Sequence, residues 1–120
     1  MDDGVRRALN RDRTIDITTT GRRSGRPQRI EIWFHNLRGK LYITGLPGRR
    51  GWYANLVANP EFTFHLKQSA QADLPARARP ITDDGERHAV LAEILQRLGR
   101  NELERWVEAA PLVEVELTES

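Results

Sequence analysis

Arginines and glycines are concentrated in two short loops, and together these residue types suit the binding of an anion. The first loop is Gly21–Pro27, with the sequence GRRSGRP, and the second, residues 45–51, contains Arg49 and Arg50. Guanidinium groups match phosphate and carboxylate oxygens, and backbone amides in glycine turns add further donors. The second loop runs into an expected helix start, whose positive dipole end favours negative charge. A turn of this composition can also be an ordinary solvated hairpin. Both loops flank the same expected pair of strands, however, so we expect them to serve one acidic ligand.

Aromatic side chains near these loops could supply the flat apolar surface that a ring system needs. They are Trp33, Tyr42, Trp52 and Tyr53. Core packing is the alternative for such residues, and for Trp52 it is the stronger one. Trp33 is the more informative, because it lies on the polar face of an alternating strand, where a solvated residue would be ordinary.

The remaining reactive residue types do not form a recognisable catalytic or metal-binding pattern. The chain has no cysteine, and His35, His65 and His88 fall on different expected elements without metal-ligand spacing. We expect each histidine to be hydrogen-bonded or at the surface. We predict no catalytic side chain and no metal, so that any reactive group is borrowed from a cofactor.

Alternation of apolar and polar residues predicts six short strands, which suit hairpin connections and a small β-barrel. The expected strands cover residues 15–18, 28–35, 40–44, 62–67, 72–81 and 112–117. Pro75 and Pro80 in the fifth are typical of an edge strand. The last strand has a clean apolar face and could pair with a second copy, which favours a homodimer.

Helical spacing predicts one larger helix and two short ones. The larger helix is Asp84–Leu98, with a capping box from Asp83 and Glu86 and a stop at Gly99. The short helices cover residues 52–58 and 101–109, and residues 1–13 are predicted to form a loosely held helix or arm.

Length and composition indicate a single domain over residues 1–120. No apolar run is long enough for a membrane span, and the first residues lack the apolar stretch of a secretion signal, so we expect a cytoplasmic location. Positive charge lies mostly before residue 51, but the net charge is only +2 and no nucleic-acid-binding module is visible. We therefore expect a small-molecule substrate and no nucleic acid.

Two motifs in this order resemble the deazaflavin-dependent nitroreductase family. The first is TTGRRSGRP at residues 19–27, and the second is WYANLVANP at residues 52–60, after a glycine-rich loop. The resemblance implies a mainly β fold, an FMN-binding-like split β-barrel. It also implies coenzyme F420, a deazaflavin ring with a ribityl phosphate and an oligoglutamate tail. An acidic tail of this kind would suit the two arginine loops.

The resemblance also implies a set of cofactor-binding positions. Those implied for the phosphate and tail are Arg22, Arg23, Ser24, Arg26, Gly48, Arg49 and Arg50. Those implied around the ring and at the helix start are Trp33, Thr44, Gly45, Leu46, Trp52, Tyr53 and Asn55.

Three functions are compatible with these features. The leading one is an oxidoreductase that uses reduced coenzyme F420 for hydride transfer to a quinone, an enone or a nitro compound. The second is a split-barrel protein that binds FMN, heme or another acidic ring ligand, with or without turnover. The third is a basic interaction module without enzymatic activity. Positive charge focused on two loops, instead of spread along one face, favours the first.

Overall fold

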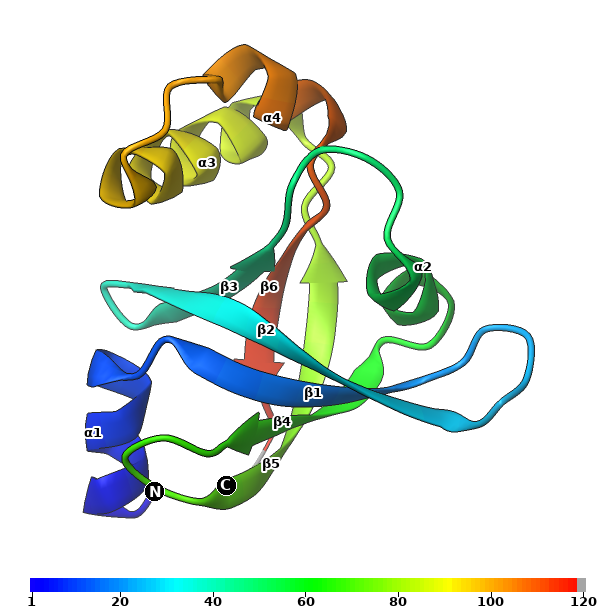
Figure 1. The fold of residues 1–120 in the computed structure, drawn as a ribbon, viewed down its shortest axis with the longest axis vertical. Helices are drawn as coiled ribbons and strands as arrows, with labels where there is room; N and C mark the ends of the chain where they lie inside the picture. The colour runs from blue at the N-terminus through cyan, green and yellow to red at the C-terminus, as the bar shows by residue number, and fades with distance from the viewer. Residues whose placement is uncertain (119–120) are drawn as a thin grey trace.

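Six antiparallel strands close into a barrel in the computed structural model, which describes residues 1–118 (Figure 1). The strands are β1 (Thr14–Thr20), β2 (Pro27–Leu37), β3 (Lys40–Thr44), β4 (Glu61–Leu66), β5 (Ala72–Pro80) and β6 (Leu112–Leu117). Around the barrel their order is β1, β2, β3, β6, β5 and β4. The mainly β barrel predicted from the sequence is confirmed.

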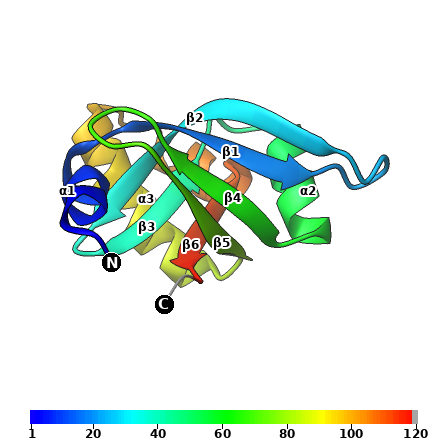
Figure 2. The ribbon, with the colours of Figure 1, turned by 90° about the horizontal axis from the view of Figure 1, so that it is seen from below.

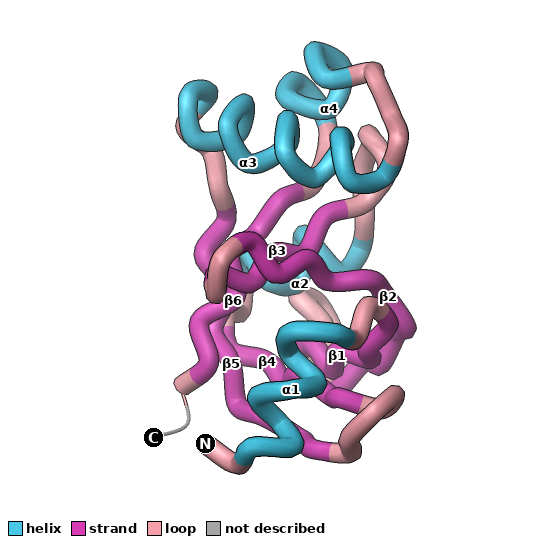
Figure 3. Tube along the Cα trace, turned by 90° about the vertical axis from the view of Figure 1, so that its left-hand side faces the viewer, coloured by secondary structure: helices cyan, strands magenta, loops and turns pink. Residues whose placement is uncertain are grey.

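Helices cover both ends and one side of this barrel. They are α1 (Asp3–Arg11), α2 (Gly51–Ala58), α3 (Asp84–Leu98) and α4 (Leu103–Ala109). Helices α3 and α4 pack together at one end and α1 lies at the other (Figures 1 and 3). Helix α2 lies beside the turn that joins β1 to β2 (Figure 2). None of the helices in residues 1–118 has the length and apolar character needed to cross a bilayer.

The N-terminal segment is a better-defined helix than predicted, so the expected count of three helices was wrong by one. The Asp2 carboxylate caps α1 by accepting hydrogen bonds from the amides of Gly4 and Val5. Ala8 and Leu9 are buried against the barrel core. Few apolar residues make this contact, which explains why the sequence pattern suggested only a loose arm.

Strand β3 connects two hydrophobic cores. Leu41 and Ile43 point into the barrel, where Phe34 and Phe64 meet edge to face at 5.2 Å between ring centres. Tyr42 points to the other side and joins the core under α3 and α4. Both faces of β3 are therefore buried, and the helical layer is fixed to the barrel next to the loop that follows β3.

The closed barrel overturns the expectation of exposed edge strands. Strand β6 pairs with β3 on one side and β5 on the other, and β5 lies between β6 and β4. Val113 and Val115 are buried in the barrel and are not available to a second copy. The homodimer stays a prediction, and it would need a different surface.

The glycine that ends α3 offers a test of the backbone argument. Gly99 has a φ of 69°, and a Cβ built there would meet nothing within 4 Å, so alanine would suffer only backbone strain. Gly99→Ala should lower the free energy of unfolding by about 1 kcal/mol. Gly51→Ala, also in open space but at the first position of α2, should be neutral or slightly stabilising. Urea denaturation of both variants checks this pair, and equal losses would contradict the argument.

Candidate functional site

The loop between β3 and α2 presents a glycine turn followed by an uncapped helix start. Gly48 has a φ of 125°, and its amide donates to the carbonyl of Ala109 at 3.0 Å, which ties the loop to the end of α4. Arg50 precedes the helix in an extended conformation, and no side chain caps the helix there. The positive end of α2 is therefore free of an internal acceptor side chain.

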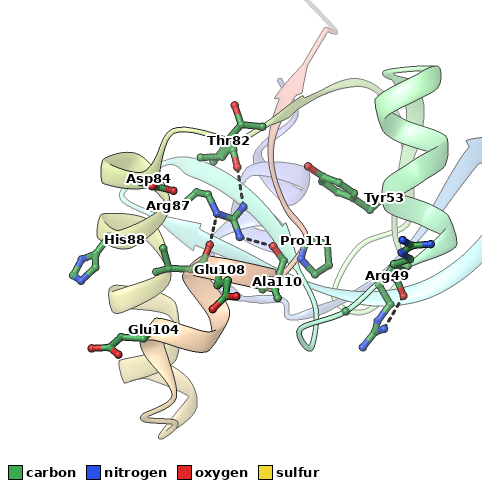
Figure 4. A pocket seen from close by; sticks show the side chains of 15 residues that line it. Arg49, Tyr53, Thr82, Asp84, Arg87, His88, Glu104, Glu108, Ala110 and Pro111 are labelled. Atoms are coloured by element: carbon green, nitrogen blue, oxygen red, sulfur yellow. Dashed lines mark hydrogen bonds between the residues drawn. The ribbon is translucent and has the colours of Figure 1, made fainter.

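A cavity of about 830 Å³ separates this loop from the helical layer (Figure 4). Gly48, Arg49, Arg50 and Tyr53 line one side. The opposite side comes from the segment that leads into α3, from α3 itself and from the end of α4. Its members include Thr82, Asp84, Arg87, His88, Glu104, Glu108, Ala110 and Pro111.

The loop arginines differ from most other arginines in having no carboxylate partner. Within residues 1–118, no ion pair involves the arginines of either loop, which are Arg22, Arg23, Arg26, Arg49 and Arg50. Elsewhere Arg38 forms a two-bond pair with Glu93, and Arg79 bridges Glu86 and Glu114. Uncompensated charge on two loops leaves a positive field for an external anion.

The first arginine turn is fastened to α2 through Asn55. The side chain of Asn55 is 1% exposed. Its amide nitrogen donates to Thr19 Oγ1 and to Gln28 Oε1 at 3.1 and 3.0 Å. Its oxygen accepts from both the backbone and the guanidinium of Arg22, each at 3.1 Å. Asn55 has no spare donor, so its role is to position the Arg22 turn against the helix.

Other predicted positions lie apart from the cavity lining. Trp33 is 46% exposed and lies under the Arg13 guanidinium, 4.9 Å from its ring centre. The Thr44 hydroxyl donates to the carbonyl of Pro111 at 2.5 Å. Trp52 packs edge to face on Tyr53 and lies next to Gly45. Among the predicted positions, Gly48, Arg49, Arg50 and Tyr53 line the cavity. The other predicted positions do not line it; they are Arg22, Arg23, Ser24, Arg26, Trp33, Thr44, Gly45, Leu46, Trp52 and Asn55.

Sequence reasoning missed the helical side of the cavity. Arg87 is the clearest case, since its side chain is buried at 8% exposure and, within residues 1–118, donates only to backbone carbonyls. A signal was present: Arg87 precedes Val90, Leu91 and Ile94 at the spacing of the buried stripe of α3. A charged residue within an apolar helical stripe indicates a buried cation.

The histidines do not gather in the cavity. His65 is buried, with Thr18 Oγ1 at 2.7 Å from Nε2 and Asp73 Oδ1 at 2.7 Å from Nδ1. His88 lines the cavity but points outward from it (Figure 4). Within residues 1–118, no group of three or more histidine and carboxylate side chains could hold a metal ion.

His35 should make stability depend on pH. Burial, with the nearby charges of Arg13 and Arg97, lowers its pKa from 6.5 to about 4. Between these values the unfolded chain binds a proton that the folded protein does not, so stability falls as the pH drops below 6.5. The loss from pH 7 to pH 5 attributable to His35 should be about 2 kcal/mol.

Urea denaturation of His35→Gln and wild type at both pH values isolates this contribution. The wild type should lose about 2 kcal/mol more than the variant. His88→Gln, at an exposed position, is the matched control and should behave like wild type. A His35→Gln protein with the full wild-type pH dependence would contradict the assignment.

A family model matches most of the chain. The F420H(2)-dependent quinone reductase family model matches residues 2–102, and the chain belongs to this family. It is therefore an F420-dependent oxidoreductase, and F420 is its cofactor. This confirms the family resemblance, the enzyme class and the cofactor predicted from the sequence. The match ends before α4, which supplies part of the cavity.

Solved structures share the fold at low sequence identity. An F420 reductase is 21% identical, covers 99% of this chain and 97% of its own, and has a TM-score of 0.71. The conserved hypothetical protein Rv2991 of Mycobacterium tuberculosis is 16% identical over 99% of this chain and 82% of its own, with a TM-score of 0.74. HutZ, a heme storage protein of Vibrio cholerae, is 17% identical over 97% and 89%, with a TM-score of 0.73.

Proposed function

We propose that this protein reduces a small electron-poor carbonyl compound, a quinone or a conjugated enone, and that the acceptor binds in the cavity between the β3–α2 loop and the α3–α4 layer. The observation that carries the proposal is the cavity itself. It opens beside Arg49 and Arg50, which have no carboxylate partner among the described residues, and it is large enough for a ring-sized ligand. A nitro compound is a further acceptor of the same electronic type.

The donors at the loop suit the acidic part of coenzyme F420. Arg49 and Arg50 have no carboxylate partner among residues 1–118, and the first amides of α2 have no side-chain cap. We assign the phosphate to this loop, and the tail to the loop together with the turn that contains Arg22, Arg23 and Arg26. When bound, the reduced coenzyme supplies a hydride to the acceptor.

The protein's own contribution is binding, orientation and exclusion of water. Tyr53 is held at right angles to Trp52, with 6.0 Å between ring centres, and gives the cavity an aromatic wall. Pro111 and Ala110 give the facing wall a rigid apolar surface. Two such walls can hold a flat acceptor in one orientation, which makes the transfer between bound partners an effectively unimolecular step.

The direct test is turnover by the purified protein. Reduced coenzyme F420 mixed with a small quinone such as menadione should be oxidised much faster with the protein than without it, as followed by the visible absorbance of the oxidised coenzyme. Reduced FMN in place of reduced F420 is the cofactor control, and heme binding is checked by absorbance. Quinone reduction equal to the protein-free rate would contradict the proposed acceptor class.

No histidine should be essential for this reaction. His35 is partly buried, His65 has both ring nitrogens hydrogen-bonded, and His88 points outward. Single replacements by glutamine should each leave turnover within about tenfold of wild type, equivalent to about 1.4 kcal/mol in the barrier. Steady-state rates at saturating coenzyme measure this. A thousandfold loss in a variant with an intact fold by circular dichroism would reveal a protein acid or base.

A further inference from the structure

Arg87 is a buried cation whose hydrogen-bond partners are all neutral. Its Nε donates to the carbonyl of Val107 at 2.8 Å, and Nη1 donates to that of Ile81 at 2.8 Å. Nη2 donates to the carbonyls of Trp106 at 3.1 Å and Ala110 at 2.6 Å. The side chain therefore joins the entry to α3 with the end of α4, and it does so without neutralising its charge.

The charge of Arg87 is directed to the cavity. In Figure 4 the guanidinium lies at the cavity wall and faces the side on which Tyr53 stands, whereas Glu104 and His88 point outward. Asp84 and Glu108 also line the cavity, yet within residues 1–118 no carboxylate forms an ion pair with Arg87. A guanidinium carries five N–H groups, and four of those on Arg87 are used, which leaves one on Nη1.

A buried charge without a counter-ion is costly unless something else compensates it. Four carbonyl dipoles offset part of that cost here. The remaining positive potential favours an oxygen that carries negative charge, and the remaining N–H gives that oxygen a donor.

We propose that Arg87 forms an oxyanion-binding site on the α3–α4 side of the cavity, and that the substrate of the proposed function binds there through an oxygen that becomes negative on reduction. A quinone that receives a hydride gains one new bond to hydrogen, and an electron pair moves onto the remaining carbonyl oxygen. One proton from water then completes the hydroquinone, while reduced coenzyme F420 becomes oxidised. Arg87 binds the anionic oxygen before that proton arrives. This assignment rests on the proposed function.

A matched pair of ring ligands tests the site without turnover. Pentafluorophenol is ionised at neutral pH, and pentafluoroanisole is the same ring with the oxygen methylated and neutral. Fluorine NMR titration of the full chain gives both dissociation constants. We expect the phenolate to bind at least tenfold more tightly, since a charge-assisted hydrogen bond of typical strength corresponds to about tenfold or more.

Three variants show which residue is responsible for the tighter binding of the phenolate. Arg87→Met should reduce the phenolate-to-ether ratio to about twofold or less, because it removes the charge and the donor. The double variant Arg49→Ala/Arg50→Ala, which removes the cations on the other side, should keep the wild-type ratio. His88→Gln, whose side chain points outward from the cavity, should also keep the wild-type ratio. Thermal unfolding of each variant shows whether the fold is intact. If Arg87→Met does not fold, the phenolate-to-ether ratios of the wild type and of the double variant test the proposal. A ratio of about tenfold or more in both supports it.

The outcomes separate this site from the coenzyme's own anionic groups. A wild-type ratio near one overturns the proposal, as does a ratio lost in the double variant. Saturating oxidised coenzyme F420 should leave phenolate binding intact, and displacement of the phenolate would mean that Arg87 binds the coenzyme's phosphate instead of the acceptor. Phenolate selectivity without any quinone turnover would refute the proposed function while leaving the oxyanion site in place.

Discussion

Replacing Arg49 and Arg50 together by alanine should weaken the binding of oxidised coenzyme F420 on the order of a hundredfold. Neither guanidinium has a carboxylate partner in residues 1–118, so neither charge is neutralised before the ligand arrives. Charge-assisted bonds to phosphate or carboxylate are roughly twice as strong as neutral ones, and two overlapping contacts account for this magnitude. Fluorescence titration of the coenzyme measures the change.

A second double variant controls for net charge. Arg77→Ala/Arg100→Ala also removes two positive charges, but these arginines are paired with Glu61 and Glu102 at 3.7 and 3.2 Å. It should bind the coenzyme almost as wild type does. Added salt should weaken binding to the wild type and to this control more steeply than to the Arg49/Arg50 variant. Equal losses in the two double variants, or equal salt slopes, would remove the second loop from the coenzyme site.

Features determined by neighbouring residues were predictable from the sequence. Helix α3 begins and ends where its local signals indicated: Asp83 accepts from the amide of Glu86 at 2.8 Å, and Gly99 adopts the left-handed conformation. The strands follow the alternation of apolar residues, as in β1, where Ile15 and Ile17 are fully buried. In each case the evidence lies within a few residues of the element.

Features determined by distant pairing were not predictable. The ladder between β3 and β6 joins Leu41 to Val115, and no local pattern specifies that contact. It closes the barrel, so the edge strand that Pro75 and Pro80 predicted does not exist. Pro75 is paired with Thr63 inside the sheet, while its carbonyl accepts from the amide of Thr118 at 3.0 Å. A proline lacks one backbone N–H, but its carbonyl can still accept a hydrogen bond. The presence of proline therefore does not show whether a strand has one neighbouring strand or two.

The candidate site also has one part that was predictable from the sequence and one part that was not. The loop with Arg49 and Arg50 was visible because composition and position both indicate an anion site. The facing wall was not, because Arg87 looks like an ordinary helix-surface residue until its burial and its neutral partners are known. Asn55 shows the converse, since a motif position expected to touch the cofactor has its whole amide engaged within the protein.

Replacing the Asn55 amide by a carboxylate is expected to destabilise the fold strongly. Asn55→Asp keeps the oxygen that accepts from Arg22 but replaces the donor nitrogen by a second acceptor. That acceptor would face Gln28 Oε1 and Thr19 Oγ1, now at 3.0 and 3.1 Å from the nitrogen. The Thr19 hydroxyl can turn and donate to it, whereas Gln28 Oε1 can only accept. At 1% exposure, water cannot repair the mismatch, and a buried carboxylate is added.

The free energy of unfolding should fall by about 2–4 kcal/mol in Asn55→Asp, from one unsatisfied buried contact at Gln28 and the partial desolvation of a charge that Arg22 only partly offsets. Urea denaturation at pH 7 measures it. Asn59→Asp, at the end of the same helix and partly exposed, is the matched control and should change stability by less than about 1 kcal/mol. Because Asn55 also holds the Arg22 turn, the folded fraction of the variant should bind coenzyme F420 more weakly than wild type. A loss below about 1 kcal/mol would mean that the turn and α2 are held together by contacts other than this amide.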